Sequence, residues 1–315
     1  CWAILEKLTP VRRVLLLAAV LCLIFPGTGF SYHGSNGELQ VVELDFHFFG
    51  GLLLLLVLML EVADRVVMKR DLEIARDIQR WLLPATAPEV PDLGIAFATR
   101  AANTVAGDYY DVFPRAGEST AKSYLVTVAD VAGKSIPAAL LMATFQASLK
   151  TLSSVPCSLD ELVRAMNEYA CSNSQNGVRF TTAFLSEYDA VSRQLTYINA
   201  GHNAPMLRRK SGTIERLTVG GLPLGMFAGT PYELGTVQLE SGDWLIIFTD
   251  GLIEAINERD EEYGETRLET VLQYGAAASP EELLRRMMFD VDVFVGTTPQ
   301  HDDITCLLLK VAAAV

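Results

Sequence analysis

The sequence has few cysteines, and none of them forms a Cys-x-x-Cys pair. The five stand far apart, at Cys1, Cys22, Cys157, Cys171 and Cys306. An odd number of isolated cysteines argues against a disulfide framework or a zinc site and fits a reducing compartment. The residues that follow Cys157 and Cys171 do not form a loop that could cradle an anion, which argues against a cysteine-dependent phosphatase.

The chain also lacks a surplus of positive charge. Its net charge is −13, and the first 83 residues hold eight Lys/Arg against nine Asp/Glu, which leaves −12 for the rest. Nucleic-acid binding needs a basic face, so we expect no nucleic-acid partner. Such an acidic domain is compatible with divalent cations, although acidity alone usually reflects solubility.

A complete nucleotide-binding P-loop is missing as well. Gly133-Lys134-Ser135 follows an apolar run and precedes a helical pattern, as the end of a P-loop does. That loop requires a glycine five positions before Gly133, where the chain has Val128. A nucleoside triphosphatase is therefore not expected.

Long apolar runs are confined to the first 63 residues, which we predict to be a membrane region. A helix needs about 20 predominantly apolar residues to span a bilayer. The runs at 11–30 and 46–63 come close to this length and predict two membrane helices. The alternative is one span plus a buried or signal-like helix. The sequence begins at Cys1 rather than Met, which indicates a fragment or a processed product.

The charges that flank these runs predict their orientation. Lys7, Arg12 and Arg13 lie before or at the start of the first run and three cations follow the second, whereas the connecting segment 31–45 has three acids and neither Lys nor Arg. By the positive-inside rule, the connecting segment lies outside and the rest of the chain is cytoplasmic.

Residues 64–84 continue the second helix as a charged linker with apolar residues near helical spacing, and Pro84 ends it. The linker either packs on the following domain or dimerises and transmits membrane signals. Three imperfect heptads do not establish a coiled coil, so both interpretations stay open.

Residues 85–315 form the third region, in which strands mostly follow one another without intervening helices. This order favours an α+β domain with antiparallel sheets covered by helices. The predicted strands lie near 95–102, 108–114, 123–129, 181–188, 194–200, 205–209, 213–217, 244–249 and 303–311. The predicted helices lie near 136–152, 158–172, 265–275 and 279–294.

Carboxylates stand at the ends of several of these strands. Asp130 ends the apolar run from Tyr124, Asp108 follows Gly107, Asp250 ends the run from Trp244, and Asp302-Asp303 precede the last strand. Each could start an ordinary turn. Carboxylates that cluster repel one another, and hard cations such as Mg²⁺ or Mn²⁺ relieve that repulsion.

Five motifs occur in an order that resembles a known family. They are G-D-Y-Y-D, D-V-A-G-K-x-x-P-A-A-L, N-A-G-H-N-A-P, T-D-G-L-x-E-A and D-D-I-T. The resemblance is to the metal-dependent Ser/Thr protein phosphatases (PPM class), and within them to the bacterial SpoIIE/RsbU-type branch. It covers residues 76–309 and implies an αββα sandwich of two antiparallel sheets flanked by helices, anchored in the bacterial inner membrane.

The resemblance also implies a site for two divalent cations, Mn²⁺ or Mg²⁺. Asp130 would bridge both ions, assisted by the Val131 carbonyl, while Asp302 and Asp250 would each complete one ion's ligands. Asp108 would act mainly through water on the metal, and Asp111 and Asp303 would either orient waters or cap turns. Asp130, Asp250 and Asp302 would thus carry catalysis through a metal-activated water.

The implied reaction is hydrolysis of phosphoserine or phosphothreonine on a regulatory protein, of the anti-sigma-factor antagonist type in this branch. The chain departs from the branch at Ala106 and Ser135, where glycine is frequent, and it lacks the D-G-H-G of the eukaryotic relatives. No general acid is assigned, since His202 lies in a predicted tight turn and His301 is expected to be solvated. The alternative function is a catalytically inactive receptor domain that binds partners.

Overall fold

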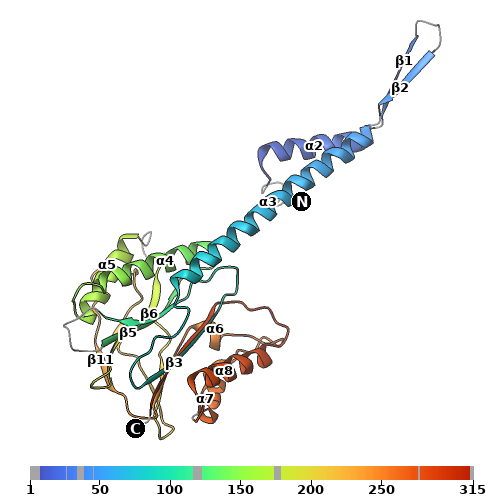
Figure 1. Ribbon diagram of the computed structural model, residues 1–315. Helices are drawn as coiled ribbons and strands as arrows, with labels where there is room; N and C mark the ends of the chain where they lie inside the picture. Colours follow the sequence, from blue (N-terminus) through green and yellow to red (C-terminus); the bar gives the residue numbers. More distant parts are fainter. Residues whose placement is uncertain are drawn as a thin grey trace. The chain divides into compact units, whose positions relative to one another are not determined.

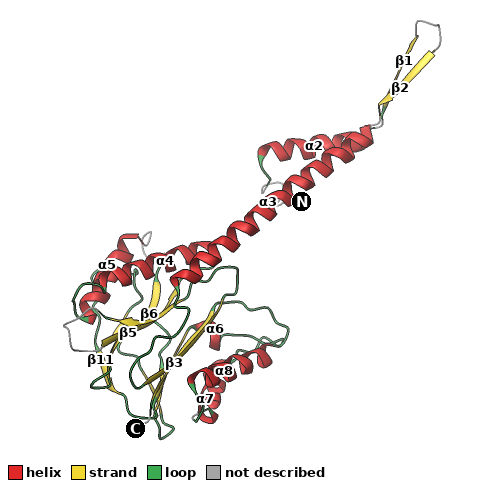
Figure 2. Cartoon of the chain, viewed as in Figure 1, coloured by secondary structure: helices red, strands yellow, loops and turns green. Residues whose placement is uncertain are grey.

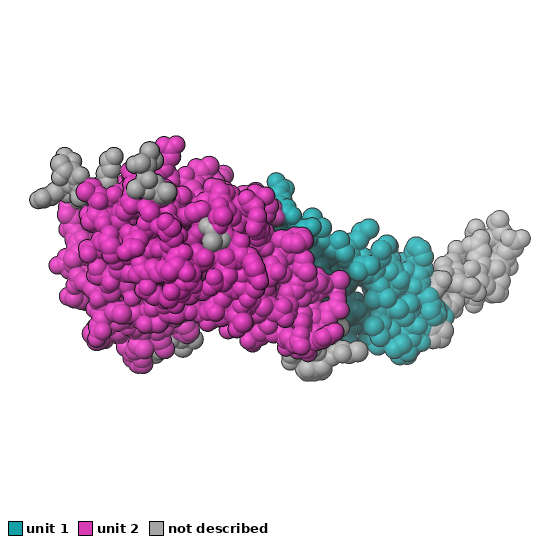
Figure 3. Space-filling model, turned by 90° about the horizontal axis from the view of Figure 1, so that it is seen from below, with its two compact units in different colours: residues 1–74 teal, residues 75–315 magenta. Residues whose placement is uncertain are grey.

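The computed structural model describes residues 8–25, 27–33, 39–44, 46–115, 123–173, 179–275 and 277–312. The chain divides into two compact units, residues 1–74 and 75–315, which Figure 3 colours separately. The first unit holds both apolar runs, and the second holds the strand-end carboxylates.

The first apolar run forms helix α2 (Pro10–Ile24), which ends before the predicted boundary at residue 30. Phe25 at its C-cap has an extended backbone, with φ −89° and ψ 129°, as is typical of a residue before proline. Strand β1 (Thr28–His33) follows and pairs antiparallel with β2 (Leu39–Leu44). The prediction of a helix over 11–30 is therefore wrong only after Ile24, and much of segment 31–45 is a β-ribbon.

Helix α3 (Phe46–Leu82) is continuous over 37 residues and contains both the second apolar run and most of the predicted linker. Among the described residues, it is the one helix long and apolar enough to cross a membrane by length and composition. Arg12 of α2 pairs with Glu61 and Asp64 of α3, at N–O distances of 3.2 and 2.7 Å. This contact neutralises the carboxylates where the apolar part of α3 ends.

Two sheets form the centre of the second unit (Figures 1 and 2). The first has the order β10-β7-β6-β5-β4, with β11 also paired to β7, and its strands are β4 (Tyr109–Pro114), β5 (Ser123–Val131), β6 (Thr181–Asp189), β7 (Gln194–Ala200), β10 (Gly220–Gly221) and β11 (Gly235–Gln238). The second has the order β3-β13-β12-β8-β9, and its strands are β3 (Leu93–Arg100), β8 (Met206–Arg208), β9 (Ile214–Arg216), β12 (Trp244–Phe248) and β13 (Ile304–Val311). All of these pairings are antiparallel except that of β10 with β7.

Helices cover the outer face of each sheet, as Figure 1 shows. Helices α4 (Ser135–Leu152) and α5 (Leu159–Asn173) cover the first sheet, and α7 (Gly264–Tyr274) and α8 (Pro280–Val295) cover the second. The short helix α6 (Asp250–Ile253) follows β12. The predicted α+β class and αββα sandwich are therefore confirmed.

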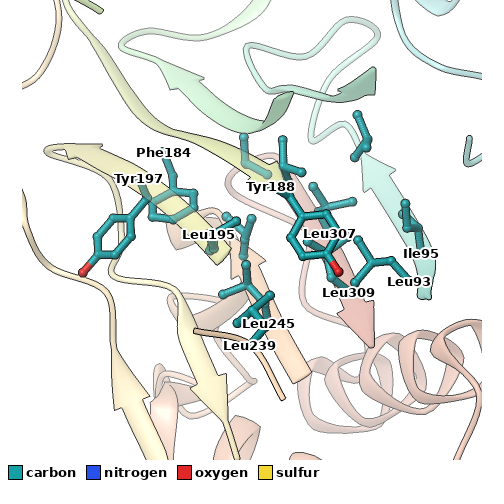
Figure 4. Close-up of a cluster of buried hydrophobic side chains, with 14 of the residues drawn as sticks. Leu93, Ile95, Phe184, Tyr188, Leu195, Tyr197, Leu239, Leu245, Leu307 and Leu309 are labelled. Carbon is teal, nitrogen blue, oxygen red and sulfur yellow. The ribbon is translucent and has the colours of Figure 1, made fainter. Parts of the chain in front are cut away.

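The apolar core lies in three layers that follow the alternation of the strands. Val126 and Val128 of β5 face the second sheet, while Leu125 and Ala129 face α4 and α5, because successive side chains of a strand point to opposite faces. Figure 4 shows the layer between the sheets, where Tyr188 lies beside Leu307 and Leu309 and Phe184 lies beside Tyr197. Fully burying one such side chain contributes about 1.5–3 kcal/mol, so this layer fixes the two sheets against each other.

The predicted strands and helices of the second unit all occur, with boundaries within two residues. Strands β10 and β11 were not predicted, because two glycines and a four-residue segment carry too short a pattern. The predicted end of the linker helix before Pro84 is confirmed, since α3 ends at Leu82.

Candidate metal centre

Asp130 occupies the second-to-last position of β5, opposite Thr182 of β6. A tight loop follows, in which Gly133 has φ +121° and Ser135 has φ +65°. The amide of Ala132 donates to the Phe180 carbonyl at 2.9 Å, so the loop is tied back to the first sheet. The end of the strand thus holds Asp130 in a fixed place.

Asp108 precedes β4 and is almost completely buried. Its carboxylate accepts a hydrogen bond from the Thr249 hydroxyl at 2.9 Å, so it faces the end of β12 in the second sheet. Burial, followed by the charge of Asp130, raises the pKa of Asp108 well above its usual range. Asp108 therefore links the two sheets. Its carboxylate has no cationic partner among the described residues.

Asp250 begins α6 directly after β12. Burial and the charge of Asp302 raise its pKa. A Cβ on Gly251 would lie 2.1 Å from the Asp303 carbonyl oxygen, so only glycine allows this close approach. Gly251 therefore lets the Asp250 turn lie directly against the segment of Asp302 and Asp303.

Asp302 and Asp303 differ in their surroundings. The Asp302 side chain is 43% exposed, and its Oδ2 lies 3.0 Å from the Lys134 ammonium. Asp303 is buried and accepts hydrogen bonds from the amides of Ala102 at 2.7 Å and Gly107 at 2.6 Å. Asp303 thus fixes the loop that carries Asp108, and Asp302 faces the solvent side of the cleft.

Contacts at Gly107 place these carboxylates near one another: a Cβ on Gly107 would lie 3.8 Å from Asp130 Oδ1, and the Gly107 amide donates to Asp303. The pKa of Asp130 is raised to about 7, first by burial and then by the charges of Asp250, Asp302 and Asp303. Such mutual elevation requires carboxylates that lie near one another in a region of low dielectric constant. The segments that carry Asp108, Asp130, Asp250, Asp302 and Asp303 thus lie against one another, and the assignment of these residues as metal ligands stays a prediction.

Asp111 lies elsewhere. It stands three positions after Asp108, so the alternation of β4 turns its side chain toward α4. There its Oδ2 lies 2.6 Å from the Lys150 ammonium and accepts a hydrogen bond from the Tyr109 hydroxyl at 2.7 Å. The structure thus separates Asp111 from the carboxylate cleft and gives it a partner of its own.

His202 is buried behind the cleft rather than exposed in it. Its Nδ1 lies 3.2 Å from the Thr182 hydroxyl, and its backbone amide donates to the Asn199 side chain at 2.7 Å. Burial lowers the pKa of His202 to about 4, so the imidazole is neutral at pH 7. A buried neutral imidazole supports a structural role, as expected from the turn motif. His301 is exposed, as also expected.

Sequence reasoning missed two residues that shape the cleft. Gln79 of α3 is buried, donates to the Ala106 carbonyl at 2.6 Å and accepts from the Ala106 amide at 3.0 Å. It thereby fastens the segment that precedes Asp108. The second residue is Lys134, which reaches across to Asp302. A polar residue on the buried face of a helix was the signal for Gln79. Lys134 stands in the D-V-A-G-K motif, but nothing in that motif indicated its contact with Asp302.

The donor set fits hard divalent cations. Carboxylate oxygens and the Val131 carbonyl are the ligand types that Mg²⁺ and Mn²⁺ prefer. Within the described residues, no three Asp, Glu, His or Cys side chains stand close enough to hold one ion by themselves. Mg²⁺ is usually held by one or two carboxylates with several waters, so this spacing is compatible with it.

A family model and two curated relatives match this chain. The family model for stage II sporulation protein E (SpoIIE) matches residues 120–312. Phosphoserine phosphatase RsbU of Bacillus subtilis is 28% identical over 243 residues, covering 77% of this chain and 70% of RsbU. Protein IcfG of Synechocystis is 27% identical over 273 residues, covering 78% of this chain but only 42% of IcfG.

A solved structure agrees with these matches. The SiaA-PP2C domain of Pseudomonas aeruginosa superposes with a TM-score of 0.67 at 23% identity, covering 79% of this chain and 98% of that domain. This likeness identifies the fold of the second unit as that of PP2C phosphatase domains.

Proposed function

Because the chain belongs to the SpoIIE family, we propose that residues 85–315 are a metal-dependent Ser/Thr protein phosphatase domain. The observation that carries this proposal is that the strand ends bearing these carboxylates meet: Asp108 accepts from Thr249 beside Asp250, and Gly251 lies directly against the segment of Asp302 and Asp303. Clustered buried carboxylates whose pKa values are raised are typical of a functional site.

We assign the ligands residue by residue. Asp130 and the Val131 carbonyl would hold the divalent cations together with Asp250 and Asp302. Asp108 acts through water, which fits its burial and its bond to Thr249. When bound, two such cations supply a nucleophilic water at neutral pH and neutralise phosphate oxygens, so no covalent intermediate is needed.

The other residues of the cleft position these ligands. The Thr249 hydroxyl accepts a hydrogen bond from the Thr305 amide of β13 at 2.9 Å and donates one to Asp108. Strand β13 therefore orients this hydroxyl, which directly follows β12, toward the Asp108 carboxylate. Asp303 holds Gly107 and Ala102 in the same way. Removing such supporting hydrogen bonds typically costs about 10–100-fold in metal affinity or activity.

The substrate we propose is phosphoserine or phosphothreonine on a small regulatory protein of the anti-sigma-factor antagonist type. The phosphoserine phosphatase RsbU, which covers most of the second unit, supports the phosphoserine class. A partner-binding domain without activity is the alternative. The presence of every proposed carboxylate ligand favours the enzyme.

We further propose that α3 anchors the chain in a membrane with the phosphatase domain in the cytoplasm. The first half of α3 is apolar, with side chains such as Leu58 largely exposed, and Arg65, Lys69 and Arg70 follow it. In the linker, the exposed apolar side chains of Ile74, Ile78 and Trp81 recur at helical spacing. Such a stripe supports a homodimer through the linker helix.

The test is hydrolysis of a phosphoserine peptide by the full chain, with Mn²⁺ and without it, beside Asp250→Asn. We expect turnover that requires Mn²⁺ and falls by more than about 100-fold in the variant, because ligand loss exceeds the effect of a supporting residue. The matched control is Asp160→Asn, which changes a partly exposed carboxylate of α5 that lies outside the carboxylate cleft. Turnover without added metal would contradict the class, and absent turnover with intact partner binding would favour the inactive alternative.

A further inference from the structure

The charge balance of the cleft becomes negative once the substrate phosphate binds, even with two divalent cations present. The proposed ligands Asp108, Asp130, Asp250 and Asp302 carry four negative charges, which two divalent cations offset, and Asp303 adds a fifth. A phosphate monoester then brings about two more negative charges near neutral pH. Burying them beside carboxylates is costly unless the chain supplies a cation of its own.

Lys134 is the cation in position to do this. Among the described residues, it is the only Lys or Arg whose side-chain nitrogen lies within 4 Å of any of these four carboxylates. Its ammonium lies 3.0 Å from Asp302 Oδ2 and donates to the His301 carbonyl at 2.7 Å. The side chain is 55% exposed, so it is not locked in place by packing.

The loop geometry aims Lys134 across the cleft. The residue stands at the N-cap of α4, where its ammonium, which has no acceptor, cannot cap the helix. Its neighbours Gly133 and Ser135 both have positive φ, so the backbone turns sharply on either side of it. The result is that a side chain from the end of β5 reaches the segment before β13, which belongs to the other sheet.

A cavity of about 180 Å³ opens beside this contact. Lys134, Asp302 and His301 line it, together with Arg100 and Gln300. The Arg100 guanidinium pairs with Asp292, while its Nε is buried without a hydrogen-bond partner among the described residues. Two cations, Lys134 and Arg100, thus line the same space as Asp302 and Glu254, in a domain that is otherwise acidic.

We propose that Lys134 binds the phosphate group of the substrate. In the metal-free protein its ammonium rests on Asp302, and when cations occupy the carboxylates it bonds to a phosphate oxygen instead. A lysine serves this purpose well because its ammonium is a compact charge with three donors on a flexible stem. This inference rests on the proposed phosphatase function, since it concerns the same cleft.

The test compares the full chain with Lys134→Gln and Lys134→Arg, and with Arg164→Gln as a matched control. Arg164 is also exposed and also pairs with a carboxylate, Asp160, on α5. Calorimetry measures the binding of inorganic phosphate in the presence of Mn²⁺, and, separately, the binding of Mn²⁺ alone. KM and kcat for a phosphoserine peptide complete the set.

We expect Lys134→Gln to weaken phosphate binding by about tenfold or more, which is typical of a lost charge-assisted hydrogen bond. KM should rise more than kcat falls, and Lys134→Arg should recover part of the loss. Mn²⁺ should bind Lys134→Gln as tightly as the wild type or more tightly, because the ammonium no longer competes for Asp302. Arg164→Gln should match the wild type throughout.

Two results would overturn the proposal. One is phosphate binding in Lys134→Gln equal to that of the wild type. The other is a parallel loss of Mn²⁺ affinity, which would show that Lys134 only shapes the metal centre. If the wild type hydrolysed no phosphopeptide, the phosphatase function would fail, and phosphate binding would still decide the role of Lys134 because it needs no turnover.

Discussion

Asp108 and Asp111 are three residues apart and both are buried, but only Asp111 has a cationic partner among the described residues. Asp111 faces α4, where Lys150 neutralises it and Tyr109 donates to it. Asp108 faces the second sheet, where its neighbours include the carboxylates of Asp130 and Asp303. A buried carboxylate with an internal cation serves stability, whereas a group of them without enough cations is prepared for an external one.

Removing the charge at the centre of the cleft should have the largest effect. We expect Asp130→Asn to reduce phosphopeptide hydrolysis by more than about 100-fold, because the bridging ligand is lost. The metal-free variant should melt no lower than the wild type, since the change removes a crowded charge whose pKa is raised to about 7. Kinetics measures the loss of hydrolysis, and thermal unfolding measures the melting temperature. A metal-free variant that unfolds would contradict the interpretation that Asp130 is a crowded charge.

Asp303→Asn tests the carboxylate that supports the cleft. The amide can still accept from one backbone N–H but repels or misaligns the other, of Ala102 or Gly107. We expect activity to fall by about 10–100-fold, together with a loss of about 1–3 kcal/mol in the free energy of unfolding. Denaturant titration beside the kinetic assay separates the two effects. Loss of activity with unchanged stability would instead identify Asp303 as a ligand.

Asp111→Asn tests the buried carboxylate that has a cationic partner of its own. It leaves Lys150 without its carboxylate, and because Lys150 is 37% exposed, the cost is reduced to about 1–2 kcal/mol. Activity per folded molecule should stay within about threefold of the wild type, because Asp111 touches no proposed ligand. If Mn²⁺ affinity fell as in Asp130→Asn, Asp111 would belong to the metal centre after all.

The smallest effect is a dependence of stability on pH. Asp130 has a folded pKa of about 7, above its usual 3.8, so the stability it contributes is present at low pH and lost as pH rises through 7. Lowering the pH from 7 to 6 should therefore stabilise the metal-free wild type by about 1 kcal/mol, or about 2–4 °C in Tm. Asp130→Asn should lack this increment. With Mn²⁺ present the trend should reverse, because protons then compete with the cation.

The fold could be predicted from the sequence where local pattern and tertiary environment agree. The runs ending at Asp130 and at Thr249 are apolar on both faces, and both are strands buried between another sheet and helices. The first helix was overextended to residue 30 because hydrophobicity alone does not register the restriction that proline places on Phe25. Strand β10 depends on its partner β7 rather than on its own two glycines.

The carboxylates of the site could be predicted for a similar reason, since strand ends place acids at the edges of sheets. Their partners could not. The spacing of three between Asp108 and Asp111 already put them on opposite faces, but only the tertiary structure supplies Lys150 to Asp111. The contact of Lys134 with Asp302 likewise joins residues 168 positions apart in chain order, through two different sheets.

Anomalous diffraction from crystals of the full chain grown with Mn²⁺ tests the central claim most directly. If residues 85–315 form a two-metal phosphatase, we expect two adjacent manganese peaks, both within about 2.5 Å of Asp130 oxygens. Asp250 should lie on one ion and Asp302 on the other. Manganese bound away from these three carboxylates, or a cleft without manganese at saturating concentration, would contradict it.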